Sequence, residues 1–208
     1  MAGSEKFWDK AAERYSKRSV SDAATYQRKL TETQSYFTPN MRILEFGCGT
    51  GTTAIEHASH VQHVDAIDIS ENMLWIARSK AKEAGVENIK FTHGTLTEFN
   101  ADAGSLDAVL GLSVIHLLPN RQAVIAEVAR ILKPSGIFIS STVCLGHSYL
   151  RFIKLAVPLG KLLGLMPEVF VLTEDELVSE IINAGFVVER QWHHGKNGIV
   201  VFIVARKV

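Results

Sequence analysis

The chain has 208 residues, and its 22 lysines and arginines balance its 22 aspartates and glutamates, so the formal net charge is zero. A chain of this length buries roughly 70% of its unfolded surface in one domain and folds without disulfides or structural metals. The neutral charge, together with the lack of any cluster of basic and aromatic residues, argues against a nucleic-acid partner.

The two cysteines, Cys48 and Cys144, lie in apolar or glycine-rich surroundings without metal-ligand spacing. This usage is typical of a reducing compartment. Residues 1–6 contain no apolar run of the kind found in a secretory signal. We therefore predict one cytoplasmic domain over residues 1–208 that holds no metal, and we leave its oligomeric state open.

Short apolar runs alternate with longer stretches of helical periodicity, the pattern of parallel strands joined by crossover helices. A mostly helical region over residues 1–40 comes first. Ser70 and Gly85 are well placed to begin and end one helix, and Pro134 with Gly136 ends another. The predicted strands are 41–46, 64–69, 89–92, 106–111 and 137–142, and the predicted helices between them are 71–84 and about 121–132.

The last third of the chain contains an insertion, a helix and a hairpin. Residues 143–172 are longer than a usual connection and strongly apolar, so we interpret them as an inserted lid. Thr173 and Glu176 form the pattern of a capping box for a helix to Ala184. Strands over 186–191 and 199–205 are joined by a glycine-containing loop, which favours an antiparallel hairpin.

A glycine-rich motif follows the first predicted strand and points to a nucleoside-bearing cofactor. Gly47, Gly49 and Gly51 occupy alternate positions, where a backbone without side chains can turn tightly and approach a ligand. Asp68 ends the next strand, where a carboxylate can accept hydrogen bonds from ribose hydroxyls.

The spacing of the motif distinguishes between cofactors. Dinucleotide sites usually read G-x-G-x-x-G, whereas here the third glycine comes one residue early. Glu45 lies two residues before the first glycine, where its carboxylate repels a pyrophosphate but suits an ammonium or sulfonium group. A dinucleotide-dependent oxidoreductase remains the less favoured alternative.

The block over residues 43–51 resembles the first motif of the class I methyltransferases that use S-adenosylmethionine. Residues 68–74, 106–109 and 132–136 are similar to later motifs of that family, and residues 7–15 resemble its ubiquinone and menaquinone group. The resemblance implies an α/β fold with a Rossmann-like doubly wound sheet: seven strands, a C-terminal antiparallel hairpin, an N-terminal helical cover over residues 1–40, and the inserted lid.

The resemblance also implies which residues bind the cofactor. Asp68 is expected to hold the ribose, Ile69 and Met73 to lie along the adenine, and Trp75 to pack in the core with Met73. The family commonly has aspartate after the third strand, but this chain has Thr95, so adenine recognition rests on its hydroxyl or on the Leu96 backbone amide. The full predicted cofactor set is Glu45, Gly47, Cys48, Gly49, Gly51, Asp68, Ile69, Met73, Thr95, Leu96 and Leu112.

The expected chemistry is an in-line transfer of a methyl group, for which alignment and exclusion of water matter most. His116 follows the fourth strand and is the candidate general base, with packing beside the cofactor as the alternative. Arg28 is a candidate for contact with the methionine carboxylate, with a solvated helix face as the alternative. Asp107 is expected to be structural.

The resemblance favours a small acceptor, apolar or aromatic, because no motif for base methylation follows the fourth strand. A regulator that binds the cofactor and transfers nothing is the remaining alternative. Residues 149–166 are apolar and carry Arg151, Lys154 and Lys161. We interpret them as an apolar wall of the acceptor pocket, with peripheral membrane contact as a further hypothesis and an ordinary packed helix as the alternative.

Overall fold

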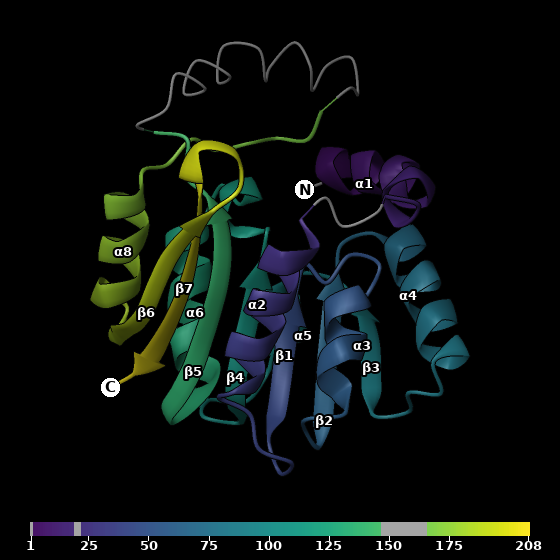
Figure 1. The fold of residues 1–208 in the computed structure, drawn as a ribbon, viewed down its shortest axis with the longest axis horizontal. Coiled ribbons are helices and arrows are strands. Elements are labelled where there is room, and N and C mark those ends of the chain that lie inside the picture. Colours follow the sequence, from purple (N-terminus) through teal and green to yellow (C-terminus); the bar gives the residue numbers. More distant parts are fainter. Residues whose placement is uncertain (1, 19–21, 147–165) are drawn as a thin grey trace.

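A seven-stranded sheet forms the centre of the protein, in the computed structural model that describes residues 2–18, 22–146 and 166–208 (Figure 1). The strands run in the order β3-β2-β1-β4-β5-β7-β6. Their bounds are β1 Arg42–Phe46, β2 His63–Asp68, β3 Ile89–His93, β4 Leu106–Leu112, β5 Leu132–Val143, β6 Phe186–His194 and β7 Val200–Lys207. The first five pair in parallel, and β7 pairs antiparallel with both β5 and β6. This arrangement confirms the predicted doubly wound sheet with its C-terminal hairpin.

Helices cover both faces of the sheet. They are α1 Ala2–Ser16, α2 Ala23–Gln34, α3 Thr52–Ala58, α4 Glu71–Glu83, α5 Leu96–Phe99, α6 Arg121–Ile131 and α8 Glu174–Asn183, with 3-10 turns η1 Ile115–Leu117 and η3 Lys196–Gly198. Alternate residues of β1 face different cores, because side chains alternate along a strand. Leu44 and Phe46 pack with α6 and α8, whereas Ile43 packs with α3 and α4.

Residues 132–136 were predicted to end a helix in a tight turn before the strand at residue 137, and the structure differs there. Strand β5 begins at Leu132, which pairs with Leu106, and the ladder resumes at Ile137 opposite Ala108. The residues between form a bulge in which Ser135 has a φ of 62°. Asp107 accepts hydrogen bonds from Arg42 N (2.8 Å) and Lys133 Nζ (2.7 Å) beside this bulge, in agreement with its structural assignment.

Local capping signals produce the helices as expected. Ser70 accepts from Met73 N at the start of α4, and Thr173 forms a reciprocal capping box with Glu176 at the start of α8. The prediction that Trp75 packs in the core with Met73 is wrong, because Trp75 is 69% exposed whereas Met73 is buried. The helical spacing of α4 turns Trp75 toward solvent instead of the core.

The two ends of the predicted insertion pack onto the domain. Val143 belongs to β5, Leu172 is fully buried, and Gly146 N donates to Leu172 O (2.9 Å). Residues 147–165 lie outside the described residues, and with them most of the segment 149–166 and its three basic residues. Across the described part of the chain, no helix is long and apolar enough to span a membrane.

Candidate cofactor site

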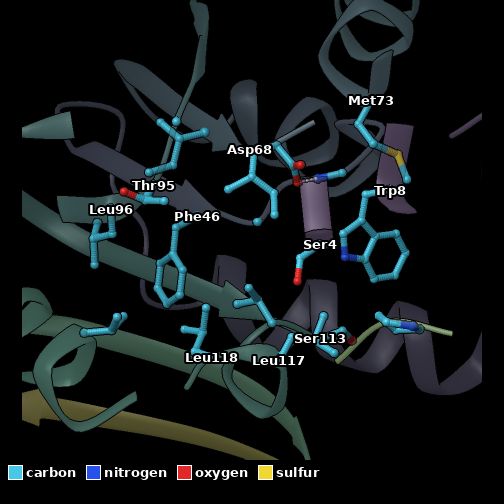
Figure 2. A pocket seen from close by; sticks show the side chains of 18 of the residues that line it. Ser4, Trp8, Phe46, Asp68, Met73, Thr95, Leu96, Ser113, Leu117 and Leu118 are labelled. Carbon is cyan, nitrogen blue, oxygen red and sulfur yellow. Dashed lines mark hydrogen bonds between the residues drawn. The ribbon is translucent and has the colours of Figure 1, made fainter. Parts of the chain in front are cut away.

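A cavity of about 230 Å³ lies at the carboxyl ends of the parallel strands β1, β2 and β4 (Figure 2). Open α/β sheets bind ligands at this edge, where the strand order reverses. The reversal falls between β1 and β4, the central pair of the sheet. The cavity is walled by the loops after these strands, by the start of α5, by α1, and by Pro167 and Glu168 from the end of the insertion.

The glycine loop over residues 47–51 shapes one wall of the cavity. All three glycines have positive φ values, of 66°, 55° and 71°. A Cβ on Gly47 would lie 2.6 Å from Val114, and one on Gly51 would lie 2.7 Å from Ala77 Cβ. Gly47 and Gly49 line the cavity, whereas Gly51 is a contact point between α3 and α4. The loop therefore exposes its backbone to a ligand through two of its three glycines.

Asp68 lies at the cavity wall, at the end of β2. Its Oδ2 accepts from Gly49 N (2.8 Å), and its Oδ1 accepts from Ser70 N (2.9 Å). Burial raises the pKa of this carboxyl, while the two backbone donors lower it. The carboxylate thus holds the glycine loop against the turn between β2 and α4, and it still faces the cavity.

Apolar side chains form the rest of the expected adenine region. Ile69, Met73, Leu96 and Leu112, four of the residues predicted to bind the cofactor, all line the cavity. Figure 2 shows Met73 at one end of the cavity with Trp8 and Ser4, and Leu96 and Phe46 toward the other end. Gly111 makes room for Phe46, because a Cβ there would lie 2.5 Å from the ring.

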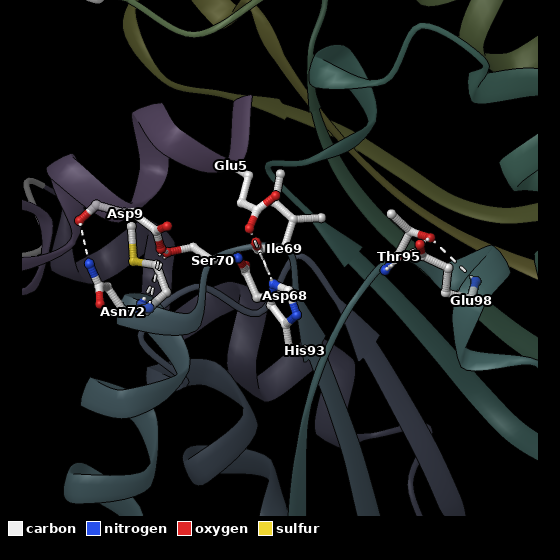
Figure 3. Close-up of polar contacts among 10 residues, drawn as sticks. Glu5, Asp9, Asp68, Ile69, Ser70, Asn72, His93, Thr95 and Glu98 are labelled. Atoms are coloured by element: carbon white, nitrogen blue, oxygen red, sulfur yellow. Dashed lines mark hydrogen bonds and ion pairs between the residues drawn. The ribbon is translucent and has the colours of Figure 1, made fainter. Parts of the chain in front are cut away.

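Thr95 lines the cavity, but its polar groups are already engaged. Its hydroxyl lies 2.8 Å from Glu98 Oε2, and its backbone N donates to the same oxygen at 2.8 Å (Figure 3). Glu98 N in turn donates to the Thr95 hydroxyl, which completes a capping box for α5. The sequence prediction that this hydroxyl serves the adenine overlooked its capping role.

Glu45 and Cys48 are buried outside the cavity lining. The neighbouring β1 residues Leu44 and Phe46 face the α6 side of the sheet, so alternation sends Glu45 to the α3 side. Its Oε2 is buried without a hydrogen-bond partner among the described residues. Burial, and then the charge of Asp68, raise the pKa of Glu45 to about 8. A buried carboxyl in this state gains from a cationic ligand group.

Helix α1 contributes three lining residues that sequence reasoning did not assign to the site. Ser4, Trp8 and Tyr15 line the cavity from one side of the helix. Tyr15 also lies against the glycine loop, 3.9 Å from where a Cβ on Gly49 would be. The sequence holds one signal for these residues: they are spaced four and seven positions apart, and residues at such spacings share one face of a helix.

Arg28 does not reach this site. Its guanidinium lies 3.8 Å from the centre of the Trp192 ring, and Trp192 Nε1 donates to Glu32 Oε2 (2.9 Å). This cation–π contact joins α2 to the C-terminal hairpin. The hypothesis that Arg28 holds the methionine carboxylate is therefore replaced by a packing role.

His116 lies in η1 but is not among the cavity-lining residues, although Leu117 of the same turn is. Burial lowers its pKa to about 4, and its Nδ1 is buried without a partner among the described residues. Its carbonyl oxygen accepts from Phe170 N (2.8 Å). This placement favours the packing alternative over the role of general base.

A second cavity of about 250 Å³ adjoins the first. Trp8, Tyr15 and Pro167 line both cavities, and Arg14 and Arg18 also line the second. No group of three potential metal ligands occurs within the described ranges.

Comparisons with known proteins agree with this geometry. Residues 43–136 match a family described as a methyltransferase domain. The uncharacterized methyltransferase YcgJ of Bacillus subtilis is 34% identical over 98 residues, which cover 47% of this chain and 39% of that protein. The demethylmenaquinone methyltransferase of Listeria welshimeri is 35% identical over 97 residues, which cover 45% of this chain and 41% of that protein. The matched part thus spans about two fifths of each relative.

A solved structure extends the likeness over the whole fold. The geranyl diphosphate C-methyltransferase of Streptomyces coelicolor, in complex with Mg²⁺, geranyl diphosphate and S-adenosyl-L-homocysteine, has a TM-score of 0.77 and covers 100% of this chain and 97% of its own. Its sequence identity of 12% makes this a likeness of fold alone. In sequence, residues 43–136 thus resemble a methyltransferase domain, and the strand order and the likeness of fold agree with that match.

Proposed function

We propose that the protein transfers a methyl group from S-adenosylmethionine to a small apolar or aromatic acceptor. The observation that carries the proposal is the hydrogen bond from Gly49 N to the Asp68 carboxylate at the cavity wall. Through this bond a carboxylate and the exposed backbone of the glycine loop line the same cavity. The match of residues 43–136 to a methyltransferase domain and the resemblance of residues 7–15 support the same proposal.

The residues present fit this cofactor. Asp68 suits the ribose hydroxyls, and the apolar side chains of Ile69, Met73 and Leu96 suit the adenine. The partnerless Glu45 carboxyl lies outside the cavity lining, so its contact with the ammonium group at the methionine end stays a prediction. When bound, the cofactor supplies a methyl group that is already electrophilic because its sulfur is positively charged.

The protein's own contribution is alignment and exclusion of water. In the transfer, the acceptor atom forms a bond to the methyl carbon while the carbon–sulfur bond breaks, with its electron pair going to sulfur. An acceptor whose attacked atom carries a proton also loses that proton, to water or to a base, whereas an acceptor without such a proton needs no base. Trp8 and Tyr15 cover the cavity from α1 and shield it from solvent.

The nature of the acceptor rests on the cavity walls and on relatives. Phe46, Leu117, Leu118 and Val124 extend the apolar lining beyond the adenine region. The Listeria relative is named for demethylmenaquinone, an apolar aromatic acceptor. Pro167 and Glu168 show that the end of the insertion reaches the site, which supports the lid hypothesis. Contact of residues 149–166 with a membrane surface remains a separate hypothesis.

Methyl transfer from radiolabelled S-adenosylmethionine to a panel of quinols, phenols and prenyl compounds tests the proposal. We expect label in at least one apolar or aromatic acceptor, and none with the Asp68→Ala variant at the same cofactor concentration. Saturable binding of S-adenosylhomocysteine without turnover across the panel would instead favour a cofactor-binding regulator. Binding of NAD in its place would favour an oxidoreductase.

A further inference from the structure

Helix α1 is held onto the domain by a polar clasp at Asp9 (Figure 3). Asp9 Oδ1 accepts from Ser70 Oγ (2.7 Å) and from Asn72 N (3.2 Å). Asn72 Nδ2 returns a hydrogen bond to the Asp9 carbonyl oxygen (3.2 Å). Three hydrogen bonds thus join one residue of α1 to the turn between β2 and α4.

The turn that Asp9 holds is the turn that positions the cofactor residues. Ser70 N donates to Asp68 Oδ1, while Ser70 Oγ accepts from Met73 N (3.2 Å) and donates to Asp9. Asp68 in turn holds Gly49. A continuous set of hydrogen bonds therefore runs from α1 through Ser70 to the carboxylate at the cavity wall.

A second contact lies one helical turn earlier. Glu5 Oε1 is 3.8 Å from His93 Nε2, and the same nitrogen is 3.0 Å from Ile69 O. Glu5 and Asp9 are four residues apart, so they share one face of α1. The Asp9 contact includes Ser70, two residues after Asp68, and the Glu5 contact ends on His93, the partner of Asp68 in the sheet.

Few apolar side chains of α1 are fully buried. Among the residues whose burial the structure describes, these are Ala11 and Ala12, and alanine buries a small area, whereas Phe7 and Trp8 are half-buried. A helix with few fully buried apolar side chains opens more readily than one with a large buried apolar face. Ser4, Trp8 and Tyr15 close the cavity only while α1 is docked.

We propose that Asp9 is a positioning residue that docks α1 over the cofactor cavity and thereby sets how long the cofactor stays bound. The proposal rests on the proposed function, because it takes S-adenosylmethionine and its product as the ligands. Asp9 itself is not in the cavity lining, and it acts through Ser70 and through the α1 side chains that cover the site.

The test compares Asp9→Ala, Asp9→Asn and Glu13→Ala for dissociation of S-adenosylhomocysteine in stopped-flow displacement. Asp9→Ala leaves two donors without an acceptor, and we expect at least tenfold faster dissociation with a similar association rate. Asp9→Asn keeps an acceptor oxygen and should partly restore the slow rate. Glu13 lies on the same helix, pairs only with Lys17 in the described contacts, and should give the wild-type rate.

Two further measurements separate positioning from a purely structural role. Ser70→Ala keeps the bond from Asn72 N to Asp9 and should therefore speed dissociation less than Asp9→Ala. In the Asp9→Ala/Ser70→Ala double variant the two effects should be less than additive, because both substitutions remove the bond between Asp9 and Ser70. Hydrogen exchange of the α1 amides in ligand-free protein should rise in Asp9→Ala while exchange in the central strands stays unchanged.

The outcomes distinguish this proposal from the proposed function. If wild-type protein binds no S-adenosylhomocysteine, the proposed function fails, and exchange of the α1 amides alone decides whether Asp9 docks the helix. Wild-type binding combined with an unchanged dissociation rate in Asp9→Ala would overturn the positioning role while leaving the proposed function intact.

Discussion

At the scale of single residues, Asp68 combines two tasks that the sequence suggested only in part. Its place after an apolar run predicted a ribose ligand, and the structure adds that it also fixes the glycine loop and the turn to α4. The second task depends on backbone donors brought together by the parallel pairing of β1 and β2. Side-chain identity alone does not reveal them.

Replacing Asp68 with alanine should weaken binding of S-adenosylhomocysteine by at least tenfold. The reason is that hydrogen bonds to a charged group contribute about 1.5–3 kcal/mol each. Isothermal calorimetry measures the change, with Asp65→Asn as a control in the same strand, since Asp65 pairs with Arg42 and His63 away from the cavity. Equal affinities for wild type and Asp68→Ala would refute the ribose assignment.

Glu45 should make the ligand-free protein less stable as the pH rises. Its folded-state pKa of about 8 exceeds the ordinary value of 4.5, so between these values the folded protein keeps a proton that the unfolded chain releases. The free energy of unfolding therefore falls through that window, and Glu45→Gln should remove roughly 2–3 kcal/mol of the fall between pH 5.5 and 8.5.

Urea unfolding of ligand-free protein at pH 5.5, 7 and 8.5 measures this effect. Glu56→Gln replaces an exposed carboxyl of α3 and serves as the control. Parallel pH profiles for wild type and Glu45→Gln would show that Glu45 is not protonated in the fold. In addition, binding of S-adenosylmethionine near pH 7 should release a proton, seen as a buffer-dependent heat of binding.

His116→Ala should change the rate of methyl transfer by less than tenfold. The side chain lies outside the cavity lining, and its lowered pKa makes it a weak base. Steady-state turnover with the best acceptor of the panel measures the effect. A fall of 10²–10⁴ with unchanged cofactor affinity would return His116 to the role of general base.

At the scale of elements, the sequence predicted those whose signals are local. The capping box at Thr173, the cap at Ser70 and the glycine loop in the hairpin all act between residues close in the chain, and each appears in the structure. The bulge at Ser135 and the packing of Arg28 on Trp192 depend on distant partners. Periodicity within one segment does not contain that information.

The insertion should be needed for methyl transfer but not for cofactor binding. Because Val143–Gly146 and Leu172 pack onto the domain, the segment to replace is 147–165 rather than all of 143–172. A Gly/Ser linker there should preserve S-adenosylhomocysteine affinity within about threefold and abolish transfer to acceptor. Undiminished transfer by the linker variant would rule out the lid.

Membrane contact of this segment is tested separately. Sedimentation with anionic vesicles should carry down the intact protein more than the linker variant if residues 149–166 contact a membrane surface. Equal sedimentation of the two proteins would leave only the lid hypothesis.

At the scale of the whole molecule, strand order places the site. The first strand, β1, lies inside the sheet, with β2 and β3 following outward on one side of it and β4 on its other side. The loops after β1 and β4 therefore diverge and leave a crevice between them. The alternation of strands and helices predicted this topology. The resemblance predicted a helical cover over residues 1–40, but not the clasp at Asp9, which joins residues more than sixty positions apart.

The crevice is proposed to bind S-adenosylmethionine and its product, not a dinucleotide. Calorimetric titration of the purified protein with S-adenosylhomocysteine and, in parallel, with NAD decides between the two ligands. We expect saturable binding of one S-adenosylhomocysteine per chain, weakened at least tenfold by Asp68→Ala, and no heat with NAD. Saturable binding of NAD, or no binding of S-adenosylhomocysteine by folded protein, would contradict it.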